Sequence, residues 1–202
     1  MNNSFRLVVA QLNPKAGDLE GNAKKVRLAF QEAKEMNANL VAFPEMFLIG
    51  YQVGDLVRKP AFVTEVMKLV DILALEFEFG PSVGLGAPYW DGKKLFNAYY
   101  ILANGKIETI IKKHFLPNDN EFDEKRYFTP GKGPGLFEVK DKKIALTVCE
   151  DILHTKAIRQ ASRRGADLVL NLNASPFHRN KRQERKTLLE SHADKFQLPI
   201  VY

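Results

Sequence analysis

The amino-acid sequence predicts a layered α/β fold in a single globular domain that spans residues 1–202. Segments with the apolar spacing of helices alternate with short, mostly apolar segments that are typical of buried strands. Two turn pairs, Asp91-Gly92 and Asn104-Gly105, interrupt a long β-rich stretch in the middle of the chain and predict hairpins there. The composition, 45% hydrophobic and 27% charged, allows a substantial core.

The N-terminal part alternates strands and helices. The apolar stretch from Phe5 to Leu12 predicts a strand, and Gly17-Asp18 signals the start of a helix. That helix has one apolar face, formed at spacings of three and four residues by Leu19, Ala23, Val26, Phe30 and Ala33. We expect a short buried strand from Asn39 to Phe43 and a second amphipathic helix from Phe62 to Phe79.

The rest of the chain returns to this alternation after its hairpins. The stretch from Ser82 to Lys113 carries the β-rich pattern, and two more strands surround Asp141 and end at Val148. The expected elements after them are a helix over 153–164, a strand from Asp167 to Leu172, a helix over 181–196 and a strand beginning at Pro199. The sequence stops soon after that last strand signal, so we expect a fold that is C-terminally incomplete and lacks its last elements.

The charge, apolar runs and cysteine content of the chain argue against several classes of protein. The net charge of +6 is spread over the chain with acidic residues interleaved, which gives little support for a polyanion partner. No apolar run approaches the roughly 18 residues that a membrane span needs. We therefore expect a cytoplasmic protein that binds neither membrane nor nucleic acid. The single cysteine, Cys149, cannot form an intramolecular disulfide.

Cys149 follows an apolar strand and precedes a predicted helix. A helix N-terminus favours a thiolate, which suits a nucleophile. The neighbouring carboxylates Glu150 and Asp151 disfavour a further negative charge, so a nearby lysine would have to compensate. A small buried core cysteine fits the position equally well, and the residues alone leave both interpretations open.

Other polar side chains stand at the ends of predicted strands. Glu45, in the segment FPEMFLIGY, could act as a general base or be an exposed loop carboxylate. Strand alternation points Lys112 and Lys113 to opposite faces, so at most one of them enters a site. A further candidate is the acidic cluster of Glu121, Asp123 and Glu124, which would otherwise be an ordinary loop.

Taken in order, these motifs resemble a known family. Phe-Pro-Glu at 43–45, a lysine before Leu116-Pro117, and Val-Cys-Glu-Asp at 148–151 resemble the Glu-Lys-Cys triad of the nitrilase superfamily of carbon-nitrogen hydrolases. Residues 116–131 and 173–185 further resemble the glutaminase domain of bacterial glutamine-dependent NAD synthetases. The resemblance covers essentially the whole chain and implies a nitrilase-like, four-layer α-β-β-α sandwich.

The resemblance also implies a role for each candidate. Cys149 matches the nucleophile and Glu45 the general base. The catalytic lysine of the family lies four residues before the proline of the Leu-Pro pair, which selects Lys113. Glu124 matches a supporting carboxylate, with Glu121 as the alternative.

Four further positions match residues that contact glutamine in that family: Tyr51, Glu150, Ser175 and Lys181. Asp119 stands where the family often has an aromatic residue, so that substrate contact is not carried over.

These residue types can hydrolyse an amide without a metal or organic cofactor. A glutamate takes the thiol proton, and the thiolate attacks the side-chain amide of glutamine to form a tetrahedral intermediate. Lys113 and the backbone N–H of Glu150 would stabilise the oxyanion. Ammonia leaves, and water then hydrolyses the thioester with the same glutamate as base.

The resemblance places this chemistry in a larger enzyme. It implies that the ammonia serves ATP-dependent amidation of deamido-NAD to NAD, with Mg, by a C-terminal synthetase domain. No ATP-pyrophosphatase SGG motif occurs within the 202 residues, so that domain is absent from this chain. We expect glutamine and the protein's own synthetase domain as partners, and a homo-oligomer.

Competing interpretations have weaker motifs. A stand-alone nitrilase-type amidase or carbamoyl hydrolase would use the same triad, but residues 116–131 and 173–185 favour the glutaminase. The basic run from His178 to Lys186 suggests a nucleic-acid module but contains no interleaved aromatic residues. The four histidines form no HExxH motif, so we expect no metal site. His154 is near Cys149 in sequence, but the flanking sequence resembles no papain or caspase signature.

Overall fold

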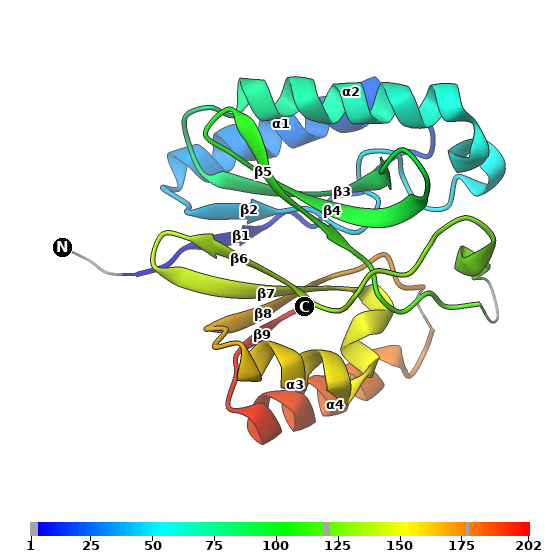
Figure 1. Cartoon of the computed structure of the whole chain (residues 1–202). Helices are drawn as coiled ribbons and strands as arrows, with labels where there is room; N and C mark the ends of the chain where they lie inside the picture. Colours follow the sequence, from blue (N-terminus) through cyan, green and yellow to red (C-terminus); the bar gives the residue numbers. More distant parts are fainter. Residues whose placement is uncertain (1–3, 119–121, 177) are drawn as a thin grey trace.

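The computed structural model describes residues 4–118, 122–176 and 178–202. Two β-sheets lie face to face, and a pair of helices covers the outer face of each, giving four layers in the order α-β-β-α (Figure 1). The predicted layered α/β sandwich is therefore confirmed. Glu121 and Asp119, both named in the sequence interpretation, lie outside the described residues.

The first sheet has the strand order β1-β2-β3-β4-β5. Its strands are β1 (Leu7–Val9), β2 (Leu40–Ala42), β3 (Ser82–Trp90), β4 (Leu95–Ala103) and β5 (Lys106–Lys112). The first three are parallel, and β3, β4 and β5 form an antiparallel meander, which confirms the two predicted hairpins. Helices α1 (Leu19–Glu35) and α2 (Pro60–Glu76) cover this sheet, with the 3₁₀ turn η1 (Gly54–Arg58) before α2.

The second sheet has the strand order β6-β7-β8-β9. Its strands are β6 (Gly135–Val139), β7 (Lys142–Val148), β8 (Leu168–Leu172) and β9 (Ile200–Val201). Only β6 and β7 pair antiparallel; the other pairs are parallel. Helices α3 (Thr155–Arg163) and α4 (Lys181–Phe196) cover its outer face (Figure 1), and the 3₁₀ turns η2 (Glu124–Arg126) and η3 (Cys149–Leu153) precede β6 and α3.

Local sequence explains where the first two helices begin. The side chain of Asp18 accepts a hydrogen bond of 3.0 Å from the N–H of Gly21, so it caps α1 at its N-terminus. The predicted apolar face of α1, including Val26 and Phe30, is buried. Helix α2 begins at Pro60 rather than at the predicted Phe62. Proline suits the first turn because its fixed φ is helical and because the backbone N–H that it lacks would have no partner within the helix there.

The two sheets meet in an apolar layer to which both contribute. From the first sheet come Leu40, Ala42, Tyr99, Ile101 and Ile111, and from the second Phe137, Val139, Ile144, Leu146, Val148, Leu170 and Leu172. Tyr99 is fully buried there, with its hydroxyl 2.6 Å from the carbonyl of Gly84 and 2.8 Å from that of Phe43. The same oxygen accepts from the N–H of Phe43 at 3.1 Å. Tyr99 thus fixes the chain two residues before Glu45.

Two further predicted elements differ in extent. Strand β1 covers Leu7–Val9 instead of residues 5–12, because its partner β2 offers only three residues for pairing. The helix predicted from residue 153 begins at Thr155, and the 3₁₀ turn η3 occupies the segment directly after β7. None of the helices in the described part of the chain has the length and apolar character that crossing a membrane requires.

Candidate active site

Four side chains that the sequence singled out lie together at one end of the sandwich. Glu45 follows β2, Lys113 follows β5 and Cys149 follows β7. Glu124 is the first residue of η2. All four are at least nine-tenths buried. The interpretations of Glu45 as an exposed loop carboxylate and of Glu124 as part of an ordinary acidic loop are therefore wrong.

A close approach of two backbones positions Glu45. The loop that follows β2 lies directly against β3 at Gly86, whose carbonyl accepts a hydrogen bond of 3.1 Å from the N–H of Leu48. A Cβ atom at Gly86 would lie only 2.6 Å from the carbonyl oxygen of Pro44. Glycine is required at this position because a side chain would push the Glu45 loop away from the sheet.

Lys113 joins the two carboxylates. Its Nζ lies 2.8 Å from Oε1 of Glu45 and 2.7 Å from Oε1 of Glu124, and the exposed fractions of the three side chains are 0%, 1% and 4%. Burial lowers the pKa of Lys113, but the charges of Glu45, Cys149 and Glu124 raise it, with a net rise above its ordinary value. Lys113 therefore stays protonated and holds a fixed positive charge in the cluster.

Glu124 has a second donor in Tyr51. The hydroxyl of Tyr51 donates a hydrogen bond of 2.7 Å to Oε1 of Glu124. Burial, followed by repulsion from Glu45, raises the pKa of Glu124, while Lys113 and the Tyr51 hydroxyl lower it. Two donors thus converge on one carboxylate oxygen and fix its orientation.

Asn97, near the start of the buried strand β4, is a member of the cluster that the sequence interpretation missed. Its Nδ2 donates to Oε1 of Glu45 at 2.7 Å and lies 3.5 Å from Oε2 of Glu124. Its backbone carbonyl accepts from the N–H of Lys113 at 2.9 Å. The signal was one amide in the apolar run Leu95–Ala103, because a buried polar side chain needs a partner.

Glu45 is also bound from the second sheet. The backbone N–H of Ala174, in the loop that follows β8, donates to Oε2 of Glu45 at 3.1 Å. Both oxygens of Glu45 are therefore engaged, one by Lys113 and Asn97 and the other by this loop. The carboxylate is held by both halves of the sandwich.

Cys149 is the first residue of η3, and its backbone is left-handed, with φ 44°. Of the charged side chains around it, Glu45 raises the pKa of its thiol most. Burial, followed by the charge of Glu45, raises the pKa of the thiol well above its ordinary value, and Lys113 opposes that rise. The thiol therefore keeps its proton, and Glu45 is the nearby carboxylate that could accept it.

This arrangement corrects the electrostatic prediction for Cys149. Cys149 begins the 3₁₀ turn η3, and α3 starts only at Thr155, so Cys149 does not stand at the N-terminus of α3. The carboxylates that raise the pKa of its thiol most are Glu45 and Glu124, not the adjacent Glu150 and Asp151.

Lys112 and Lys113 have opposite surroundings, as strand alternation predicts. Lys112 is partly exposed, with Nζ 3.5 Å from Asp91 and 3.8 Å from the ring centre of Phe96. It lies on the outer side of the strand, away from the carboxylate cluster.

Of the four positions matched to substrate contacts, one touches the cluster and two are chain neighbours of residues that belong to it or bind it. Tyr51 contacts Glu124 directly, and Glu150 is half-buried beside Cys149, 3.9 Å from His154. Ser175 is half-buried and follows Ala174, whose N–H binds Glu45. Lys181 is the half-buried first residue of α4.

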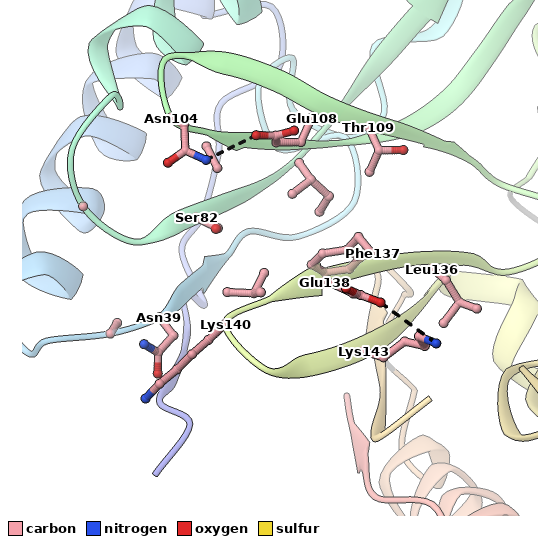
Figure 2. Close-up of a pocket in the computed structure, with 15 residues that line it drawn as sticks. Asn39, Ser82, Asn104, Glu108, Thr109, Leu136, Phe137, Glu138, Lys140 and Lys143 are labelled. Atoms are coloured by element: carbon pink, nitrogen blue, oxygen red, sulfur yellow. Dashed lines mark hydrogen bonds and ion pairs between the residues drawn. The ribbon is translucent and has the colours of Figure 1, made fainter. Parts of the chain in front are cut away.

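Two hollows adjoin the cluster. A small cavity of about 110 Å³ is lined by Tyr51 and Glu124, and a larger one of about 590 Å³ is lined by Glu150 and His154. A separate hollow of about 670 Å³ opens between the sheets at the other end of β2 and β3. Figure 2 shows that hollow, with Asn104 close to Glu108 and Glu138 close to Lys143. None of the four clustered side chains lines it.

Comparisons with known proteins identify the family of this chain. The profile of the family described as carbon-nitrogen hydrolase matches residues 6–202. The chain is 37% identical over 202 residues to a glutamine-dependent NAD(+) synthetase of Rhodobacter capsulatus, covering 100% of this chain and 37% of that protein. It is 40% identical over 192 residues to the one of Aquifex aeolicus, covering 94% and 34%. The chain thus spans just over a third of the length of these relatives.

Solved structures give the same result for the fold. The glutamine-dependent NAD+ synthetase of Acinetobacter baumannii has a TM-score of 0.93 and 32% identity, covering 98% of this chain and 38% of that one. An amidase of Nesterenkonia sp. has a TM-score of 0.83 at 22% identity, covering 98% and 74%, which supports the fold alone. From the family profile over nearly its whole length, this chain belongs to the carbon-nitrogen hydrolase family.

Proposed function

We propose that this chain is the glutamine-hydrolysing domain of a glutamine-dependent NAD synthetase. One observation carries the proposal: a buried thiol, Cys149, a buried carboxylate, Glu45, and a buried lysine, Lys113, gather at one end of the sandwich, with Nζ of the lysine 2.8 Å from Glu45 and both charges acting on the pKa of the thiol. Thiol, base and cation are the parts that amide hydrolysis through a thioester needs. The names of the Rhodobacter capsulatus and Aquifex aeolicus relatives support glutamine as the amide and NAD synthesis as the destination of the nitrogen.

The first half of the reaction forms the thioester. Glu45 accepts the thiol proton as Cys149 Sγ attacks the side-chain carbonyl carbon of glutamine, so the amide becomes a tetrahedral oxyanion. The raised pKa of the thiol keeps its proton in place until that transfer. Glu45 then gives the proton to the departing nitrogen, and ammonia leaves.

Lys113 supplies the charge that the transition state needs. Its ammonium, fixed by Glu45 and Glu124, stabilises the developing oxyanion together with the backbone N–H of Glu150. Pairing with two carboxylates keeps Lys113 protonated and prevents it from acting as a base. Its role is therefore electrostatic.

The second half of the reaction regenerates the enzyme. Water loses a proton to Glu45, attacks the thioester and releases glutamate, and the proton returns to Sγ of Cys149. Glu124, held by Lys113 and Tyr51, acts as the supporting carboxylate that keeps the lysine in position. In this proposal Tyr51, Glu150, Ser175 and Lys181 bind the rest of the glutamine.

The remaining parts of the proposal concern the whole protein. The ammonia is consumed by a synthetase domain that uses ATP with Mg to amidate deamido-NAD, and the enzyme is a cytoplasmic homo-oligomer. The test is to express the complete gene product, measure glutamine hydrolysis, and then measure NAD formed from deamido-NAD, ATP and glutamine. Light scattering reports the oligomeric state in the same preparations.

A stand-alone amidase is the alternative, since the Nesterenkonia amidase shares the fold. A panel of small aliphatic amides and N-carbamoyl compounds separates the two. Glutamine should have the highest kcat/KM. A higher value for another amide, without NAD formation, would favour the amidase.

A further inference from the structure

Asp151 connects the two segments that carry Lys113 and Cys149. One oxygen, Oδ1, accepts from the N–H of Phe115 at 2.7 Å and from the N–H of His114 at 3.1 Å. The other, Oδ2, accepts from the N–H of Val148 at 3.0 Å. The carboxylate is only 3% exposed.

The position of these bonds in the fold is specific. His114 directly follows Lys113 and belongs to the segment leaving the first sheet, whereas Val148 directly precedes Cys149 at the end of the second sheet. One side chain therefore ties the backbone beside the cation to the backbone beside the nucleophile. Glu45 and Lys113 both follow strands of the first sheet. The distance that remains to be set is therefore the one between this pair and the Cys149 sulfur.

We propose that Asp151 is a positioning residue that sets the distance between the Cys149 sulfur and the Lys113–Glu45 pair through its hydrogen bonds to both segments. The proposal deepens the proposed hydrolysis and rests on it for its kinetic readout. Asp151 itself does not touch the substrate or the reacting atoms. It acts through geometry, because a displacement of about 1 Å at reacting groups can cost roughly a hundredfold in rate.

A positioning role and a purely electrostatic role predict different results for Asp151→Glu, which keeps the negative charge. Glu45 raises the pKa of the Cys149 thiol and Lys113 lowers it. If Asp151 acts by geometry, breaking its bonds moves the sulfur relative to both charges, so the thiol pKa changes in Asp151→Glu as well as in Asp151→Asn. If it acts only as a nearby negative charge, Asp151→Asn makes the thiol easier to ionise and Asp151→Glu leaves its pKa unchanged.

Two substitutions separate these roles. Asp151→Asn has nearly the same volume, but its amide has one acceptor and one donor group, so either the Val148 bond or the His114 and Phe115 bonds are lost. Asp151→Glu keeps the negative charge and both acceptors but moves them by one methylene. Asp167→Asn is the matched control: Asp167 accepts from the N–H of Lys143 at 2.7 Å at the far end of β7.

The experiment measures the rate of iodoacetamide alkylation of Cys149 against pH, and kcat and KM for glutamine, in the complete gene product. For both Asp151→Asn and Asp151→Glu we expect an alkylation midpoint displaced from that of the parent protein and a fall in kcat of about tenfold to a hundredfold. KM should change little, and Asp167→Asn should match the parent protein.

An alkylation midpoint and a kcat that match the parent protein in Asp151→Glu, whatever the result for Asp151→Asn, would overturn the proposal. So would a loss of thermal stability alone, with alkylation and kcat as in the parent protein. If the parent protein does not hydrolyse glutamine, the proposed function fails, whereas the alkylation midpoints still test the role of Asp151.

Discussion

Replacing Lys113 by methionine should destabilise the folded chain far more than the same change at Lys112. Methionine fills much of the space of the lysine stem but leaves Glu45 and Glu124 buried without their cation. The two ion pairs are 2.8 and 2.7 Å long, and no member is more than 4% exposed. Removing one partner of such a buried pair costs about 3–5 kcal/mol of unfolding free energy.

Lys112 provides the matched comparison. Its side chain is 30% exposed, 3.5 Å from Asp91 and 3.8 Å from the Phe96 ring centre. Exposed ion pairs and exposed cation–ring contacts each contribute about 1 kcal/mol or less. Lys112→Met should therefore cost less than half as much as Lys113→Met, although both variants lose one positive charge.

The cost of Lys113→Met should also depend on pH. Burial and Glu45 already raise the pKa of Glu124, and Lys113 opposes the rise, so its removal raises the pKa of Glu124 further. A carboxyl whose pKa is higher in the folded than in the unfolded state binds its proton more tightly when folded. It therefore adds stability as pH falls through the folded pKa, and the deficit of the variant should narrow toward acidic pH.

Urea unfolding of the parent protein, Lys112→Met and Lys113→Met at several pH values measures both effects. The double variant Lys113→Met/Glu124→Gln should recover part of the loss at neutral pH, because one of the two uncompensated carboxylates is then neutral. Equal losses at Lys112 and Lys113, or a deficit at Lys113 that does not change with pH, would refute the buried-cluster argument.

Three other changes test the surroundings of the cluster. Asn97→Leu removes the donor that lies 2.7 Å from Glu45. Hydrogen bonds to charged groups contribute about 1.5–3 kcal/mol, so kcat for glutamine should fall at least about tenfold. An unchanged kcat would contradict this expectation. Tyr51→Phe removes a bond that lowers the pKa of Glu124, so the acid limb of the pH–rate profile should move to higher pH. Gly86→Ala puts a methyl group against the Pro44 carbonyl and should cost about 1–3 kcal/mol by urea unfolding, whereas a neutral result would mean that the Glu45 loop yields easily.

Much of the fold could be predicted from the sequence because the signals are local. The apolar spacing from Leu19 to Ala33 and the Asp-Gly and Asn-Gly pairs correspond to helix α1 and to the β3–β4 and β4–β5 hairpins. The end of β1 could not be predicted, because it depends on the length of its partner strand β2, which lies more than thirty residues away.

For the active-site residues, too, local signals could be read from the sequence and tertiary contacts could not. Strand alternation limited the choice between Lys112 and Lys113, but the burial of Glu45 required knowledge of what packs over it. Asn97 meets Glu45 across 52 residues of chain. Ala174 contributes only a backbone N–H, for which side-chain identity gives no signal. Contacts of this kind arise from tertiary packing and become visible only in the folded chain.

The most direct measurement is to mix the complete gene product with glutamine, quench in acid at short times, and analyse the peptide that contains Cys149 by mass spectrometry. The proposed chemistry predicts that this peptide carries one glutamyl group while turnover continues. It also predicts that Cys149→Ala, folded as judged by urea unfolding, forms no adduct and releases no ammonia. Glutamine hydrolysis by folded Cys149→Ala at a rate close to that of the parent protein would contradict the account.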